Sequence, residues 1–93
     1  MAIQRAAQIV VQGRVQGVGF RHFAKQRAEL HQIRGFVRNL LDGRVEVVGV
    51  GSRPAIKALI EDLQRGPPAS EVQKCQIQWR TEPDFFQNFS IRL

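Results

Sequence analysis

The change from strand to helix that organises this chain takes place in the segment Val11-Gln12-Gly13-Arg14-Val15-Gln16-Gly17-Val18-Gly19-Phe20-Arg21. Apolar, strand-like residues give way here to three glycines, and an arginine stands at the start of a helix-like segment. Glycines let consecutive backbone N–H groups turn towards one anion, a helix N-terminus adds partial positive charge, and arginine offers a planar fork of donors. The segment therefore predicts a strand, a turn suited to holding a phosphate, and a helix.

Hydrophobic periodicity predicts the elements on either side of this segment. Period-two patterns indicate strands, and apolar residues at three- and four-residue spacing indicate helices. The clearest amphipathic stripe is formed by Ile56, Leu59, Ile60 and Leu63. We expect strands over 7–14, 36–41, 44–50, 71–80 and 86–93, and helices over 21–32 and from Ser52 to Gly66.

Turn and cap residues separate these elements. Asp42-Gly43 predicts a two-residue hairpin turn, since its backbone needs positive φ that Gly tolerates and Asp can reach. Ser52 is a plausible N-cap, and Pro54 stands in the first turn of the second helix, where its missing N–H does no harm. Gly66-Pro67-Pro68 ends that helix, and Thr81 to Asp84 is expected to be a loop.

The resulting order is β-α-β-β-α-β-β. Two crossover helices of this kind lie on one face of an antiparallel sheet and give a two-layer α+β sandwich of the ferredoxin-like type. No linker, repeat or low-complexity tract interrupts residues 1–93, so we expect a single domain.

Composition excludes several classes of protein. The longest apolar runs are a few residues, too short for a membrane span, and the N-terminus lacks the apolar stretch of a secretory signal, so a cytoplasmic protein is expected. One cysteine, Cys75, and two scattered histidines offer neither an internal disulfide nor usual zinc spacing, and a reactive role for Cys75 is not expected. The net charge of +6 fits nucleic acid and small phosphorylated anions alike, but the positive residues are scattered singly.

Two polar residues are candidates for chemistry. A cation such as Arg21 in the first turn of a helix opposes the helix dipole, and a bound anion would remove that penalty. The glycines near it have the alternative role of merely turning the chain. Asn39 stands late in a predicted strand, where asparagine is depleted. Its side chain either bonds nearby backbone at the hairpin entrance or orients a water by donating and accepting together. The C-terminal ends of the first two strands point the same way, so Arg21 and Asn39 are expected to face one pocket.

At these residues the chain resembles the acylphosphatase family. The likeness covers nearly the whole domain, and two long motifs stand in the right order and at the right separation. The segments that carry it are Gly13 to Arg21, Gly35 to Asn39, Asp42 to Glu46, Gly66 to Ala69, Val72, and Phe89 to Ile91.

The resemblance implies hydrolysis of the carboxyl-phosphate bond in acyl phosphates, yielding a carboxylate and inorganic phosphate without metal or cofactor. The phosphate-binding arginine of the family falls on Arg21 and its water-orienting asparagine on Asn39. The backbone cradle falls on Gln16, Gly17, Val18, Gly19 and Phe20. The expected partners are a small acyl phosphate and inorganic phosphate, with no nucleic acid or membrane, and the expected state is a monomer.

The chain also departs from the family pattern. Gln32 stands where the family usually has Gly at the end of the first helix, and a left-handed backbone there implies strain of ~1 kcal/mol. His31 replaces a usual Leu. Neither change touches a signature residue, so they bear on stability, and His22 and His31 are expected on the helix surface or half-buried.

Two other functions are compatible with parts of the sequence. Ferredoxin-like sheets often bind RNA by stacking bases on exposed aromatics, but this chain has no Tyr and lacks the aromatic-glycine pattern of such strands. A regulatory acylphosphatase-like domain, such as the one that opens the large carbamoyl-phosphate-using hydrogenase maturation proteins, would be followed by zinc-binding cysteines. The chain ends at Leu93 without them, which favours a free-standing enzyme.

Overall fold

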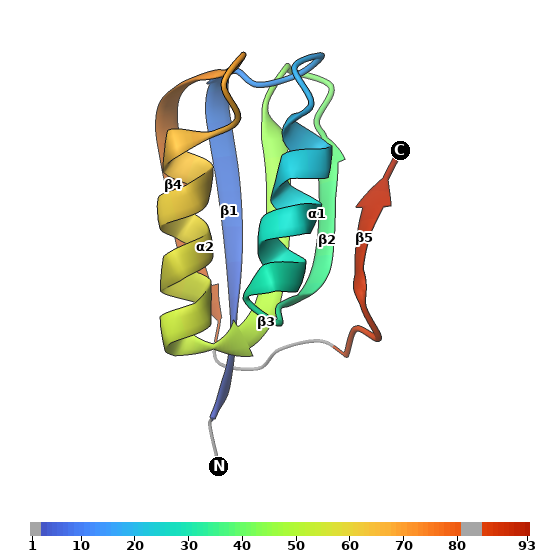
Figure 1. Cartoon of the computed structure of the whole chain (residues 1–93), viewed down its shortest axis with the longest axis vertical. Helices are drawn as coiled ribbons and strands as arrows, with labels where there is room; N and C mark the ends of the chain where they lie inside the picture. The colour runs from blue at the N-terminus through green and yellow to red at the C-terminus, as the bar shows by residue number, and fades with distance from the viewer. Residues whose placement is uncertain (1–2, 81–84) are drawn as a thin grey trace.

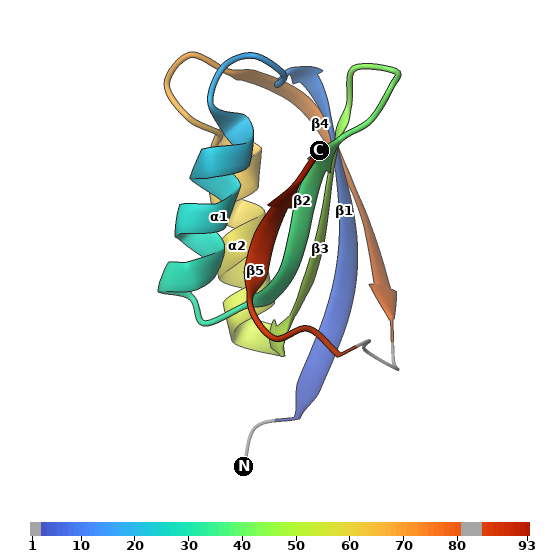
Figure 2. The ribbon, with the colours of Figure 1, turned by 90° about the vertical axis from the view of Figure 1, so that its right-hand side faces the viewer.

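The computed structural model describes residues 3–80 and 85–93, which form two helices packed on one face of a sheet. Figure 2 shows the two layers side on, with both helices on the same side of the strands. The elements are β1 (Gln4–Arg14), α1 (Phe20–Leu30), β2 (Arg34–Asn39), β3 (Val45–Ser52), α2 (Arg53–Arg65), β4 (Glu71–Arg80) and β5 (Phe89–Arg92). The predicted α+β sandwich is confirmed. The predicted loop Thr81 to Asp84 lies outside the described residues.

The sheet has the order β4-β1-β3-β2-β5. The predicted antiparallel pairing holds for β4 with β1, β1 with β3 and β3 with β2, whereas β5 runs parallel to β2 and makes the sheet mixed. Since β4 and β5 lie on opposite edges, no hairpin turn forces them to be antiparallel neighbours. In Figure 1, α1 covers the β2 side of the sheet and α2 covers the β4 side.

The core fills the space between the two layers. Alternate residues of the central strands face the helices and pack against the apolar stripes of α1 and α2. The largest fully buried side chains are Phe20, Ile9, Ile56, Leu59, Leu63, Val11, Val15, Val37, Val45 and Val47. Phe20 belongs to this core, so the start of α1 is anchored directly beneath the glycine-containing turn.

The hairpin between β2 and β3 is longer than the predicted two-residue turn. Leu40 N–H donates to the Arg44 carbonyl at 2.8 Å, so the loop has three residues, Leu41, Asp42 and Gly43. Gly43 takes φ 96°, and the Arg44 N–H donates to Asp42 Oδ1 at 3.1 Å. The aspartate therefore stabilises the wider loop through its side chain, which accepts from the backbone two residues on as in an Asx turn.

The end of α1 shows the predicted departure at Gln32. The Gln32 N–H donates to the Glu29 carbonyl at 3.1 Å, and the Ile33 N–H donates to the Ala28 carbonyl at 2.8 Å. These two bonds are the Schellman pattern, whose left-handed position favours glycine. Gln32 occupies that position with φ 59°, so the condition under which strain is expected from the sequence is met.

A buried carboxylate joins the two helices. Asp62 of α2 is 6% exposed and accepts from Arg27 Nε at 2.8 Å and from Arg65 at 3.1 Å, and it lies 2.8 Å from His31 Nε2. Burial alone raises the pKa of Asp62, but hydrogen bonds from Arg27, His31 and Arg65 outweigh it, and the pKa lies below its usual value.

Candidate active site

The turn after β1, the start of α1 and the β2–β3 hairpin lie at the same end of the molecule (Figures 1 and 2). There a small pocket of about 160 Å³ opens between the turn and the end of β2. It is lined by Val15, Gly17, Gly19, Phe20, Arg21, His22 and Asn39. The structure thus brings the predicted arginine and asparagine into one pocket, as the strand directions predict.

Two glycines give the turn its shape. Gly17 has φ 74° and Gly19 has φ 79°, values in the left-handed region that other residues rarely adopt. A Cβ added at either position would meet nothing within 4 Å. Glycine is therefore favoured at both positions because of the backbone conformation, and not because a side chain would clash with a neighbour.

The N-terminus of α1 faces the pocket without a side-chain cap. Gly19 is the N-cap residue, makes no side-chain hydrogen bond, and the first turn holds no acidic residue. By helix geometry the N–H groups of Phe20, Arg21 and His22 have no intrahelical acceptor. An anion in the pocket would meet these donors and the positive end of the helix dipole together.

Arg21 is half-buried in that first turn, and it lines the pocket. It forms no ion pair with a carboxylate anywhere in residues 3–80 and 85–93. A guanidinium placed at the positive end of a helix is unfavourable unless an anion accompanies it. A bound anion would therefore stabilise the Arg21 guanidinium at this end of α1.

Asn39 is the last residue of β2 and lines the same pocket. Its Oδ1 atom is buried and accepts no hydrogen bond from any described residue. Buried amide oxygens are usually paired, so this acceptor is suited to a donor from outside the protein. Of the two interpretations of Asn39, the one in which Oδ1 bonds nearby backbone finds no support among the described contacts.

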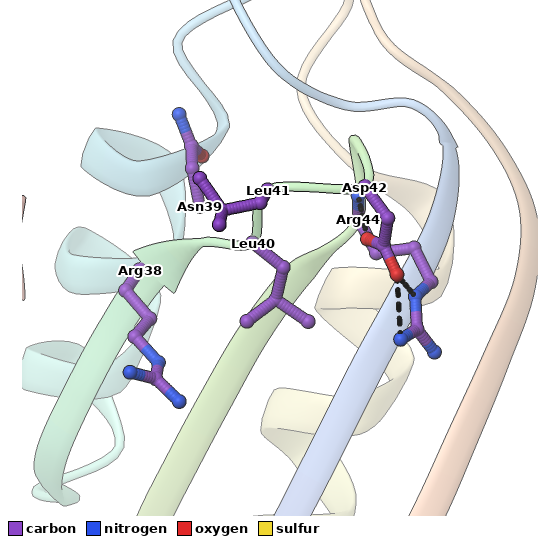
Figure 3. A pocket seen from close by; sticks show the side chains of 6 residues that line it. All are labelled: Arg38, Asn39, Leu40, Leu41, Asp42 and Arg44. Carbon is purple, nitrogen blue, oxygen red and sulfur yellow. Dashed lines mark hydrogen bonds and ion pairs between the residues drawn. The ribbon is translucent and has the colours of Figure 1, made fainter.

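A second hollow of about 420 Å³ adjoins Asn39 along the hairpin (Figure 3). Its lining is Arg38, Asn39, Leu40, Leu41, Asp42 and Arg44. Figure 3 shows the Asn39 amide pointing away from the Leu40 side chain. The two arginines here are already paired, Arg38 with Glu46 at 2.6 Å and Arg44 with Asp42 at 2.8 Å. Arg44 also holds the pKa of Asp42 below its usual value. An anion therefore finds uncommitted donors in the smaller pocket.

Gln16 and Val18 of the predicted cradle do not line the pocket. Val18 packs partly against the core. The Gln16 side chain donates from Nε2 to the carbonyl of Leu40 at 2.8 Å and to that of Arg44 at 2.9 Å. Sequence reasoning missed this role because the partners are 24 and 28 positions away and are backbone atoms, which carry no residue signal.

The placement of possible metal ligands, of the thiol and of apolar helices can also be described. Within the described ranges no three His, Cys, Asp or Glu side chains lie close enough to share a metal ion. Cys75 is half-buried on the edge strand β4, and burial raises the pKa of its thiol. Among the described residues, neither helix has the length and apolar character needed to cross a membrane.

Similar sequences and structures are found among known proteins. The sequence model of the acylphosphatase family matches residues 7–91. An acylphosphatase from Bacillus licheniformis is 42% identical over 83 residues, covering 89% of this chain and 92% of the relative. The crystal structure of acylphosphatase from Bacillus subtilis superposes with a TM-score of 0.94 at 35% identity, covering 96% of this chain and 99% of that one.

A domain of a much larger protein is also similar. Full-length HypF, in its phosphate- and nucleotide-bound form, matches 99% of this chain with a TM-score of 0.87 at 27% identity, but the match covers 12% of HypF. The relative from Bacillus licheniformis, by contrast, is covered almost from end to end. Together with the family match across residues 7–91, these likenesses show that the chain belongs to the acylphosphatase family.

Proposed function

We propose that Arg21, the backbone cradle from Gln16 to Phe20 and Asn39 carry out the hydrolysis of acyl phosphates, the activity of this family of hydrolases. The observation that carries the proposal is the meeting, in one pocket, of an arginine without a carboxylate partner, uncapped helix N–H groups and an unpaired amide oxygen. Neither of the two larger pockets, beside the β2–β3 hairpin and between α2 and β4, combines these three features.

The phosphoryl group is held by positive charge and N–H donors. Arg21 offers two parallel N–H bonds to phosphoryl oxygens, and the first-turn amides of α1 offer more. Charge on the equatorial oxygens is neutralised as the bond to the carboxylate lengthens. Because the site exists before substrate arrives, little reorganisation is needed during the reaction.

Asn39 positions the nucleophile. Its Oδ1 accepts a hydrogen bond from a water molecule, whose oxygen then attacks phosphorus in line with the leaving group. The P–O bond to the acyl group breaks, and its electron pair leaves on the carboxylate. The water proton passes to a phosphoryl oxygen, so the products are a carboxylate and inorganic phosphate.

No strong acid or base is required by this chemistry, because a carboxylate is a good leaving group. The only imidazole among the lining residues is that of His22, whose side chain is exposed. We expect no essential enzymic base, and a pH–rate profile with a required group titrating near neutrality would contradict this part of the mechanism.

The finer features of the enzyme belong to the same proposal. We infer a metal-independent, cytoplasmic monomer acting on a small acyl phosphate, with no nucleic acid or membrane partner. The compact pocket of about 160 Å³ and the scattered positive residues support a small phosphorylated ligand over a polymer.

Hydrolysis of benzoyl phosphate, followed spectrophotometrically with and without EDTA, tests the proposal. We expect equal turnover in both conditions. Turnover that EDTA abolishes would overturn metal independence. Phosphate binding without any turnover would instead favour a regulatory acylphosphatase-like domain.

A further inference from the structure

We infer that the Gln16 side chain is a positioning residue, which sets Asn39 at its working distance from the phosphate cradle. The inference rests on the proposed function and assigns to Gln16 a task beyond its expected place in the backbone cradle. Gln16 stands at the start of the turn, one residue before Gly17, while Asn39 directly precedes the hairpin on a different strand. The Gln16 amide is a direct side-chain link between these two segments.

The link uses every donor that the amide possesses. Nε2 carries two protons, and the two acceptors within reach are the carbonyls of Leu40 and Arg44, at 2.8 and 2.9 Å. These carbonyls belong to the two residues that flank the three-residue hairpin loop. The Arg44 carbonyl also accepts from the Leu40 N–H at 2.8 Å, and the Leu40 carbonyl from the Gly43 N–H at 3.2 Å. Each carbonyl therefore has both lone pairs engaged.

The consequence for Asn39 follows from chain connectivity. Leu40 is its immediate neighbour, so holding the Leu40 carbonyl limits the movement of the end of β2. Asn39 lies opposite Val45 in the β2–β3 register, and Arg44 adjoins Val45. Leu40 and Arg44, the two residues next to the Asn39–Val45 pair, are thus both held by hydrogen bonds from Gln16. Displacements of about 1 Å at a water-positioning group can cost about 100-fold in rate, which makes such a link valuable.

Phosphate binding does not depend on the link in the same way. The cradle takes its shape from the left-handed backbone at Gly17 and Gly19 and from the buried anchor Phe20. None of these features involves the hairpin carbonyls. Loss of the Gln16 amide should therefore reduce turnover while leaving the affinity for inorganic phosphate nearly unchanged.

Two substitutions remove the donors while keeping side-chain volume. Gln16→Met replaces the amide with an apolar chain, and Gln16→Glu keeps its shape but presents oxygens to two carbonyl oxygens. We expect kcat for benzoyl phosphate to fall about 10-fold or more in both, with the inhibition constant of phosphate changed by less than about 3-fold. Gln26→Met, on the exposed face of α1, is the matched control and should change neither quantity.

A double-mutant cycle separates positioning from general damage. In an Asn39→Ala background, Gln16→Met should lower kcat by less than about 2-fold, because the residue through which it acts is already gone. Independent, multiplicative losses would overturn the inference. So would unchanged kcat in Gln16→Glu, or a loss of phosphate affinity that parallels the loss of kcat.

A measurement that does not depend on catalysis tests the Gln16 link separately from the proposed hydrolysis of acyl phosphates. Amide hydrogen exchange at Leu40 and Gly43 should accelerate in Gln16→Met, while exchange within α2 stays unchanged. If the unaltered protein hydrolyses no acyl phosphate, the proposed function fails, and this exchange pattern still supports or overturns the link itself.

Discussion

At the scale of single residues, the proposed role of Arg21 depends on the planar shape of its guanidinium. Arg21→Lys keeps a positive charge in the first turn of α1 but replaces the planar fork with a single ammonium. We expect kcat/KM for benzoyl phosphate to fall by about 100- to 1,000-fold, the range typical of removing one transition-state donor. Circular dichroism should be unchanged. A variant with near-normal kcat would place the phosphoryl group elsewhere.

Asn39 should act on turnover more than on binding. Asn39→Ala removes the unpaired Oδ1 that is proposed to accept from the attacking water. We expect kcat to fall about 100-fold while the inhibition constant of phosphate shifts less than about 3-fold. Steady-state kinetics with phosphate as inhibitor measures both values. The opposite pattern would mean that Asn39 only shapes the pocket.

The residue types of this site are predictable from sequence, but their connections are not. Glycines beside an arginine at a strand-to-helix change indicate anion binding because backbone conformation and charge are local properties. The bonds made by Gln16 depend on carbonyls that only the folded hairpin brings near. That Asn39 Oδ1 is buried and unpaired likewise follows from packing, which no local pattern encodes.

Gln32 stands out in the sequence because it departs from the family pattern, in which glycine usually ends the first helix. Its φ of 59° costs a non-glycine residue about 1 kcal/mol, so Gln32→Gly should raise the free energy of unfolding by about that amount. For a domain of this size the change corresponds to roughly 4–8 °C in Tm. Gln26→Gly, within α1, is the control and should destabilise by a similar amount, since glycine is unfavourable inside a helix. Destabilisation by Gln32→Gly would show that the glutamine side chain offsets its own strain.

At the scale of elements, Asp62 of α2 stabilises the packing of α2 against α1 through its contacts with Arg27 and His31. Its folded-state pKa is depressed, so its stabilising effect is complete above its unfolded pKa, near 3.9, and is lost as pH falls through the lower folded value. Asp62→Asn should therefore lower stability at pH 7 by about 2 kcal/mol and flatten the decline in stability below pH ~4. Urea unfolding at several pH values measures both effects.

The neighbouring carboxylate Glu61 supplies the control for Asp62. Glu61 is exposed and makes no ion pair with a described residue, so Glu61→Gln should leave the pH dependence nearly unchanged. An Asp62→Asn protein with unaltered acid sensitivity would show that the helix contact does not depend on charge.

Element types were easier to predict than element partners. The stripe of Ile56, Leu59, Ile60 and Leu63 predicts α2 because apolar residues recur in the sequence with the period of a helix. Asp62 lies among these residues as an apparent exception. Its partners Arg27 and His31 are 35 and 31 positions away, so the reason for its burial appears only when the helices pack. The parallel placement of β5 beside β2 is a long-range property of the same kind.

At the scale of the whole molecule, phosphate should bind the folded state and not the unfolded state. The proposed cradle exists only when the turn, α1 and β2 are assembled together. Mass action then predicts a stabilisation of about 2.7 kcal/mol when phosphate is present at 100 times its dissociation constant. Thermal unfolding over a series of phosphate concentrations measures this effect. Steady-state kinetics should show competitive inhibition by phosphate with an inhibition constant equal to that dissociation constant.

Phosphate also stabilises folded proteins by exclusion from their surface, whether or not they bind it. Arg21→Gln separates the two effects, since it removes the guanidinium from the pocket and leaves almost all of the remaining surface unaltered. The rise in Tm for the unaltered protein should exceed that for Arg21→Gln at every concentration, and the excess should saturate as site occupancy does. Equal rises in Tm for the two proteins would mean that phosphate acts only by its exclusion from the protein surface. Phosphate would then not bind at the pocket formed by Arg21 and the α1 amides.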